Sequence, residues 1–167
     1  GGMSGDWIVL GTHYSDNGAY TNVGQAIVYK NDGSNTWELK GKLYGTSMGT
    51  YTDDHQGNFV QVHHDHALIS CFGTGSTTYG HGVLAFSLSA CTGPGVELNT
   101  PNQIITLPDN YRGYEQFKVH DNRMIIPGYS GTLQKGRAYI YEYTKGTGWV
   151  LHGTLSADGD PAIRFGM

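Results

Sequence analysis

Three copies of one pattern follow one another along the chain, and this repetition restricts the fold more than any other feature. An aspartate precedes a short apolar run at Asp6, Asp65 and Asp121, so the copies begin 59 and 56 residues apart. Trp37 and Trp149 lie 112 residues apart, which is two periods of 56. A glycine followed by alternating aromatic and aliphatic residues also recurs, at 24–29, 82–86 and 136–143. The 167 residues therefore correspond to about three periods.

Each copy has the pattern of four short strands. Apolar side chains alternate with polar ones, and turns of Gly, Asn, Asp and Ser separate the runs. In the second copy we expect strands near 58–63, 66–72, 82–88 and 103–107. No segment shows a helical period of apolar residues. A tandem four-stranded unit of roughly 40 to 50 residues is typical of a β-propeller blade, so we expect an all-β fold of three four-stranded antiparallel meanders.

The expected blades divide the chain into three parts. Residues 1–56 form the first blade, with an incomplete first strand, residues 57–112 the second, with an insertion near 91–100, and residues 113–167 the third. Three blades do not close a ring, because propellers have ~4 to 8. The ring is completed by further blades of a longer chain or by another subunit. We favour the longer chain, because an uncovered strand edge invites aggregation.

Composition excludes several classes of function. The 26 glycines suit tight turns and close strand approaches, where a Cβ would clash. The net charge is −4 and the ten Lys and Arg residues form no cluster, which argues against a nucleic-acid partner. No apolar stretch approaches the ~18 residues that cross a bilayer, so we expect no membrane span.

Five ionisable residues form the densest cluster of the chain, namely His55, His63, His64, Asp65 and His66. On a continuous strand, His64 and His66 would share one face, while His63 would lie on the other. No familiar metal-ligand spacing is present, so solvated and turn-forming roles are favoured over a metal site. We predict no metal and no cofactor. Catalytic motifs are also absent from the sequence, which favours a non-enzymatic protein.

An aromatic residue ends the expected second strand of every copy, at Tyr14, Phe72 and Tyr129. Such rings could stack on sugars around a rim, but packing between neighbouring blades explains the repetition better, because aromatic side chains bury large areas. We expect the same packing role for Trp37 and Trp149.

The two cysteines, Cys71 and Cys91, are not expected to pair. The meander would separate them by roughly 20 Å at ~3.3 Å per residue, far beyond the reach of a disulfide.

The third copy resembles the FG-GAP repeat of integrin-α-like β-propellers. Its segments 136–143, 148–155 and 164–166 are similar, in order, to the G-x-A-Y-V-Y, G-x-W-x-x-x-x-x-L and D-R-F-G consensus of that family. The Phe of the Phe-Gly pair is present only at Phe165, and the Gly-Ala-Pro element is missing. The family's calcium loop, D-x-D-x-D-G, is also missing, so calcium is not expected.

The resemblance implies an extracellular or cell-surface scaffold that makes protein-protein or adhesive contacts. A carbohydrate-binding, lectin-like propeller is the alternative, and a hydrolase or lyase on a propeller scaffold is a third possibility. The family's ligand face lies on the loops between second and third strands and between blades. Here these loops carry Tyr20, Tyr51, Asp53, Asp54, Tyr79, His81, Tyr111, Arg112, Asp158 and Asp160.

Overall fold

A computed structural model describes residues 1–16, 21–45, 55–71, 82–108, 112–113, 116–130 and 135–156, with the backbone alone at 112–113, 129–130 and 135. These residues form an all-β structure, as expected, with one short 3-10 helix, η2 (Leu88–Ala90). None of the described segments forms a helix long and apolar enough to cross a membrane.

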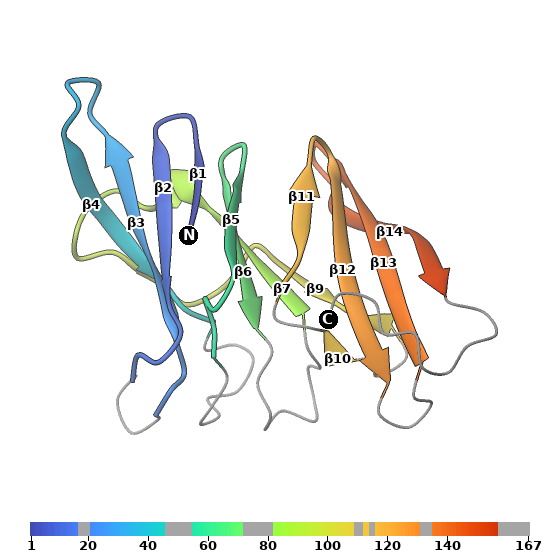
Figure 1. Ribbon diagram of the computed structural model, residues 1–167. Helices are drawn as coiled ribbons and strands as arrows, with labels where there is room; N and C mark the ends of the chain where they lie inside the picture. The colour runs from blue at the N-terminus through green and yellow to red at the C-terminus, as the bar shows by residue number, and fades with distance from the viewer. Residues whose placement is uncertain are drawn as a thin grey trace.

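Three sheets lie side by side (Figure 1). The first contains β1 (Gly2–Ser4), β2 (Trp7–Thr12), β3 (Gln25–Asn31), β4 (Trp37–Leu43) and β8 (Glu97–Leu98). The second contains β5 (Val60–His63), β6 (His66–Cys71), β7 (Gly82–Ser87) and β9 (Gln103–Thr106). The third contains β10 (Arg112–Gly113), β11 (Lys118–His120), β12 (Arg123–Ser130), β13 (Lys135–Thr144) and β14 (Gly148–Ser156).

Each sheet is built on an antiparallel meander of consecutive strands. The strands expected in the second copy are confirmed to within two residues. The expected insertion near 91–100 contains a strand that was not predicted. This strand, β8, does not join the second sheet but pairs in parallel with β4 of the first. This short strand ties two repeats together, which the local sequence pattern does not reveal.

The first hairpin of each sheet has the same two-residue turn. Ser4 pairs with Trp7, His63 with His66, and His120 with Arg123. The first turn residue is left-handed in all three, with φ of 54° at Gly5, 53° at His64 and 50° at Asp121. This register corrects the alignment of the repeats: Asp121 matches Gly5 and His64, and Asn122 matches Asp6 and Asp65.

The second hairpin carries a second shared irregularity. A register shift separates Val28 from Tyr29 in the pairing of β3 with β4, and another separates Ile140 from Tyr141 in the pairing of β13 with β14. Tyr29 pairs with Ile8, and Tyr141 pairs with Met124, in each case the second residue after the first two-residue turn of its sheet. Tyr29 and Tyr141 therefore occupy equivalent positions in the first and third sheets. The strand registers therefore define equivalent residues in the three sheets.

Both faces of the second sheet are buried, because it lies between the other two. We call the face of each sheet toward the preceding sheet its backward face and the opposite one its forward face. The first interface joins the forward-face residues Val9, Ala26, Val28 and Leu43 to the backward-face residues Ala67, Ile69, Leu84 and Phe86. The second joins Leu68, Val83, Ala85 and Ile105 to Met124, Ile126, Tyr139 and Tyr141. All sixteen are buried.

Polar contacts hold the second interface in register. The Gln103 side chain accepts a hydrogen bond from the Trp149 N–H at 2.8 Å and donates one to its carbonyl at 2.6 Å. The Tyr141 hydroxyl donates to the Thr106 carbonyl at 2.7 Å, and burial raises the pKa of Tyr141 to about 12. These bonds satisfy backbone groups that packing removes from water.

Glycine allows the first two sheets to approach closely. A Cβ on Gly2 of β1 would meet the backbone of Gln61 at 2.7 Å. Gly24, whose φ is 76°, pairs with Gln56 in an isolated bridge and leaves no room for a side chain. These contacts confirm that some glycines mark close strand approaches.

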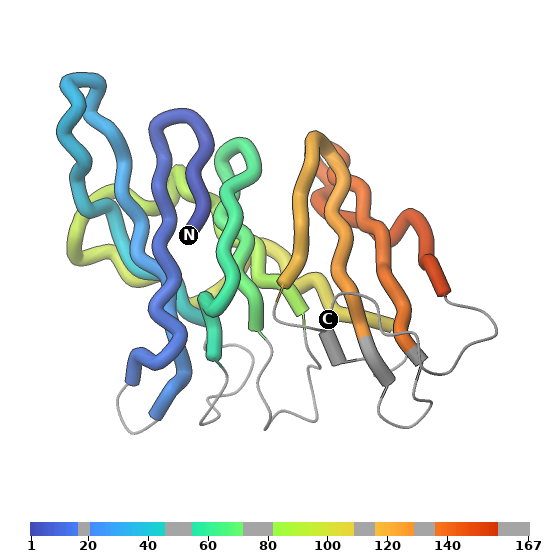
Figure 2. Tube along the Cα trace, in the orientation of Figure 1, coloured from blue at the N-terminus to red at the C-terminus, as the bar shows by residue number. Residues whose placement is uncertain are grey.

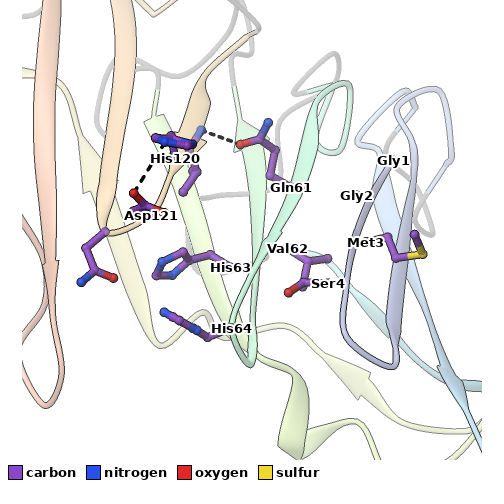
Figure 3. A pocket seen from close by; sticks show the side chains of 12 residues that line it. Gly1, Gly2, Met3, Ser4, Gln61, Val62, His63, His64, His120 and Asp121 are labelled. Atoms are coloured by element: carbon purple, nitrogen blue, oxygen red, sulfur yellow. Dashed lines mark hydrogen bonds and ion pairs between the residues drawn. The ribbon is translucent and has the colours of Figure 1, made fainter.

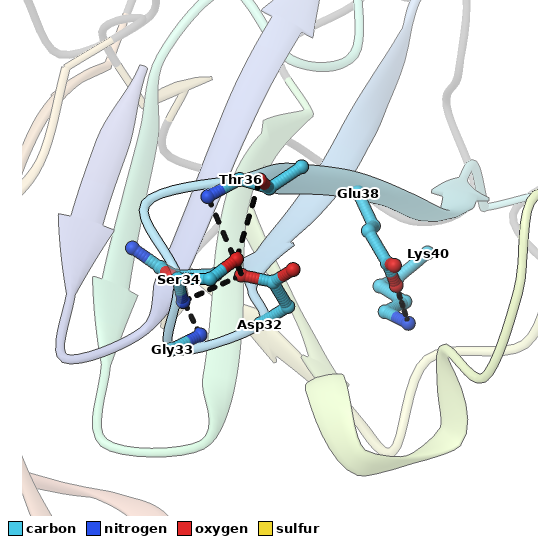
Figure 4. Close-up of polar contacts among 7 residues, drawn as sticks. Asp32, Gly33, Ser34, Thr36, Glu38 and Lys40 are labelled. Carbon is cyan, nitrogen blue, oxygen red and sulfur yellow. Dashed lines mark hydrogen bonds and ion pairs between the residues drawn. The ribbon is translucent and has the colours of Figure 1, made fainter.

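The turn between β3 and β4 is stabilised by Asp32 (Figure 4). Its carboxylate accepts hydrogen bonds from the Ser34 N–H and hydroxyl, both at 2.7 Å. The Ser34 hydroxyl is the main cause that lowers the pKa of Asp32. A carboxylate that bonds the backbone two residues ahead is a common way to fix a turn.

The cysteines both lie in the interface between the first and second sheets. No disulfide joins Cys71 and Cys91. Burial raises the pKa of Cys91 to about 11, so its thiol stays protonated at neutral pH.

We expect Gln103→Ala to destabilise the fold by about 1–3 kcal/mol, because the Trp149 N–H and carbonyl would lose both partners in a buried interface. Urea unfolding measures the change. Gln116→Ala, at an exposed glutamine, is the matched control. Equal free energies of unfolding for the two variants would contradict the role assigned to Gln103.

Candidate functional site

The first strands of the three sheets surround one open hollow of about 630 Å³ (Figure 3). The strands are β1, β5 and β11, and the turns that follow β5 and β11 also contribute. The hollow is lined by Gly1, Gly2, Met3, Ser4, Gln61, Val62, His63, His64, Val119, His120, Asp121 and Asn122. It collects residues from three repeats. The tips of the first hairpins of the three sheets point the same way (Figure 2).

Polar side chains of the hollow occupy the same position in the first hairpin of each sheet. Ser4, His63 and His120 each end a first strand, directly before the turn. Gln61 connects two of these strands, because its Oε1 accepts a hydrogen bond from the Val119 N–H at 2.7 Å. The lining is thus fixed by backbone pairing within each sheet and by one side chain between the second and third sheets.

His63 is the buried polar residue of the hollow, with only 7% of its surface exposed. Its ring packs on Tyr143 and Trp149, with centroid distances of 5.1 and 4.9 Å. Neither ring nitrogen makes a hydrogen bond to the protein. A buried imidazole whose nitrogens make no hydrogen bond to the protein is uncommon.

Burial is the main cause that lowers the pKa of His63 below its usual 6.5, and charge on His64 acts in the same direction. The backbone of Asp121 and the side chain of Asn122 face the ring and partly offset this effect, although their geometry falls short of a hydrogen bond. The neutral imidazole is therefore favoured in the folded protein.

The expectation for the histidine cluster is wrong in two respects. His64 and Asp65 form the turn, so His63 and His66 pair across the hairpin and share a face. His63 is buried, not solvated, because the third sheet covers it. The strand alternation assumed from the sequence breaks at the turn, and this reverses which histidines lie together.

Exposed ionisable side chains flank the hollow on the third sheet. His120 and Asp121 are both largely exposed, and His120 Nε2 lies 3.5 Å from Asp121 Oδ2. On the second sheet, His66 Nδ1 lies 2.8 Å from Asp65 Oδ1. These groups can donate and accept hydrogen bonds toward a partner without a change in the fold.

A groove between the second and third sheets adjoins the hollow. Tyr143 and His66 separate two depressions of about 460 and 390 Å³. Asp65, Asn122 and Lys145 line the first, and Trp149 lines the second. Trp149 is buried, yet its indole N–H makes no hydrogen bond to the protein.

Metal binding gains no support from this arrangement. In the described ranges, no three His, Cys, Asp or Glu side chains are grouped so that they could hold a metal ion. The hollow offers hydrogen-bond donors and acceptors from separate strands, which suits contact with a polar partner.

Most ligand-face residues expected from the sequence lie outside the described residues, namely Tyr20, Tyr51, Asp53, Asp54, Tyr79, His81, Tyr111, Asp158 and Asp160. Arg112 is described by its backbone, which pairs with Tyr129 in the third sheet. None of these residues is shown at the hollow.

The aromatic residues differ from the expected packing role. Tyr14 is 67% exposed and contacts the rings of His13 and His55 instead of a neighbouring sheet. Phe72 and the side chain of Tyr129 lie outside the described residues. Trp149 is buried in the second interface, as expected, but its equivalent Trp37 is half-exposed.

The hollow itself was not predicted from the sequence. One feature of the sequence points to it, because a polar residue ends the first strand in all three copies. The sequence does not show that these strand ends converge. Comparison with protein-family models, curated proteins and solved structures finds no match for this chain.

We expect the free energy of unfolding to fall as the pH decreases through 6.5 toward the lowered pKa of His63, since the unfolded chain then binds the proton more readily. His63→Gln should flatten this part of the profile, measured by urea unfolding between neutral and mildly acidic pH. His120→Gln, at an exposed histidine, is the matched control for the loss of an imidazole. A His63→Gln profile as steep as wild type would contradict this assignment.

Proposed function

We propose that the three sheets are blades of a β-propeller of the FG-GAP type and that the protein is a non-enzymatic binding scaffold. The observation that carries the proposal is the convergence of β1, β5 and β11 on one hollow. In a propeller the blades surround a central channel, and four-stranded meanders packed face to face are its building units. The resemblance of the third copy to the FG-GAP consensus supports the same architecture.

The partner of this scaffold is a protein that contacts the hollow and its hairpin tips. Its setting is extracellular or at the cell surface, as the resemblance implies. The hollow is open and presents imidazole, carboxylate, amide and hydroxyl groups, and such mixed polar surfaces suit hydrogen bonds to a partner chain.

Binding fits the geometry better than catalysis. The carboxylate of Asp121 and the imidazole of His120 are in contact with solvent. Acid and base groups that act in catalysis are usually tuned by burial and neighbouring charges within a cleft. His63 is tuned in this way, but no carboxylate among the described residues is buried beside it.

A carbohydrate partner is the second candidate, and the groove beside the hollow favours it. Tyr143 supplies a partly exposed ring that packs on the buried Trp149, and Asp65, Asn122 and Lys145 supply polar groups nearby. Ring faces cover the C–H groups of a sugar, while polar side chains bond its hydroxyls.

Protein and glycan arrays probed in parallel with the wild-type chain test the proposal. We expect retention on protein ligands, with binding reduced about tenfold, or ~1.4 kcal/mol, in the double variant His120→Ala, Asp121→Ala, because two polar contacts are removed. The matched control is Glu38→Ala with Lys40→Ala, a partly exposed ion pair on β4 that does not line the hollow (Figure 4).

Equal loss in both double variants would show that the hollow is not the binding surface. Retention on glycans instead of proteins, abolished by Tyr143→Ala, would establish the carbohydrate alternative.

A further inference from the structure

The forward face of the third sheet is apolar and, apart from Ala138, is not buried by the described residues. The strand registers show which of its residues are equivalent to the buried forward-face residues of the first and second sheets. These residues are Ile125, Ala138, Ile140 and Leu155. Ile125 pairs with Ile140 as Val9 pairs with Val28, and Ala138 pairs with Leu155 as Ala26 pairs with Leu43. In the third sheet, Ile125 and Leu155 remain 39% and 48% exposed, whereas Val9 and Leu43 are fully buried.

The backward face of the first sheet is uncovered in the same way. Ile8, Leu10, Ile27 and Tyr29 are equivalent to Met124, Ile126, Tyr139 and Tyr141, and the cross-strand pairs are the same in both sheets. The four residues of the third sheet are buried against the second sheet. In the first sheet, Leu10 is 46% exposed and the other three are partly exposed.

The backward-face pattern extends beyond these four positions. Trp37 is equivalent to Trp149, since Trp37 pairs with Asn31 as Trp149 pairs with Tyr143. Met3 is equivalent to Val119, which packs on the second interface. Both Met3 and Trp37 are exposed. The first sheet thus carries a complete set of interface residues with nothing against it among the described residues.

We propose that the backward face of the first sheet packs on the forward face of the third sheet of a second copy of this chain. The two interfaces within the chain join a forward face to a backward face at these same positions, so the contact between copies continues an arrangement that the chain already uses twice. The proposal rests on the strand registers and not on the proposed binding function, although His120 and Asp121 line both the hollow and the depression beside Ile125.

The forward face of the third sheet has a depression, separate from the hollow between the first strands, in which a side chain of the second copy can lie. About 450 Å³ in volume, it is lined by Ile125 and Ile140, with Lys118, Arg123 and Glu142 around them. In the second interface, the equivalent residues Leu68 and Ala85 are covered by the cluster that includes Met124. Ile8 of a second copy, equivalent to Met124, would enter this depression.

The strand registers also predict one hydrogen bond between the two copies. Tyr29 is equivalent to Tyr141, whose hydroxyl donates to the Thr106 carbonyl. Ser156 is equivalent to Thr106, because it pairs with Arg137 as Thr106 pairs with Gly82. The Tyr29 hydroxyl is therefore expected to donate to the Ser156 carbonyl of the second copy.

In a single head-to-tail contact, each copy uses only one of its two apolar faces. When two copies make this contact twice, both faces of each copy are used and the assembly is a closed ring. Two copies contain six sheets, within the ~4 to 8 blades of propellers. Closure removes both exposed apolar faces from water, which favours association.

Light scattering after size exclusion tests the mass of the chain in solution. We expect twice the chain mass of 18.1 kDa. Leu10→Glu and Leu155→Lys should each reduce the mass to that of one chain, because each places a charge on one of the two faces. Circular dichroism and thermal unfolding of each variant confirm that it is folded.

Leu151→Lys is the matched control, because Leu151 lies on the same strand as Leu155, is 41% exposed and pairs with the backward-face residue Tyr141. This variant should keep the mass of the wild type. Mixing the Leu10→Glu and Leu155→Lys variants should restore association, since one contact in the mixed pair is then wild type and the other joins opposite charges.

A wild-type chain with the mass of one copy at high micromolar concentration would overturn the proposal and leave further sheets of a longer chain to cover the two faces. A dimer disrupted by only one of the two substitutions, and not restored by mixing, would also overturn it, because like faces would then be paired.

Discussion

The structure depends on the burial of both faces of the second sheet. Side chains alternate along a strand, so β6 and β7 fill one core with Ala67 and Phe86 and another with Leu68 and Val83. Each buried apolar side chain contributes on the order of 1.5–3 kcal/mol relative to an exposed one. Because one pair of strands supplies both cores, the three sheets stabilise one another.

This stacking also creates the hollow. Face-to-face packing brings the first strands together, and the short hairpins place a polar strand end from each repeat around them. The third sheet covers His63, and the loss of water disfavours its charged form. The same interface that stabilises the fold therefore also favours the neutral form of one histidine of the hollow.

The two outer sheets show what the stacking leaves incomplete. Residues that are buried in the second interface have equivalents in the first sheet that are exposed, as Trp149 and Trp37 show most clearly. A repeat that cannot cover its own apolar face requires a neighbour. The pattern of exposure thus carries information about assembly that the fold of a single repeat does not contain.

The sequence by itself determined the all-β class, the three repeats and the strand positions, because alternation and glycine-rich turns act between near neighbours in the chain. It misaligned the third repeat by one residue at Asp121, and a shift of one residue exchanges the two faces of a strand. Only the tertiary structure decided that β8 joins the first sheet, that His63 is buried, and that three strand ends surround one hollow. These features arise from contacts between residues far apart in the chain, such as Gln61 with Val119, and the stacking of whole sheets decides which of them form.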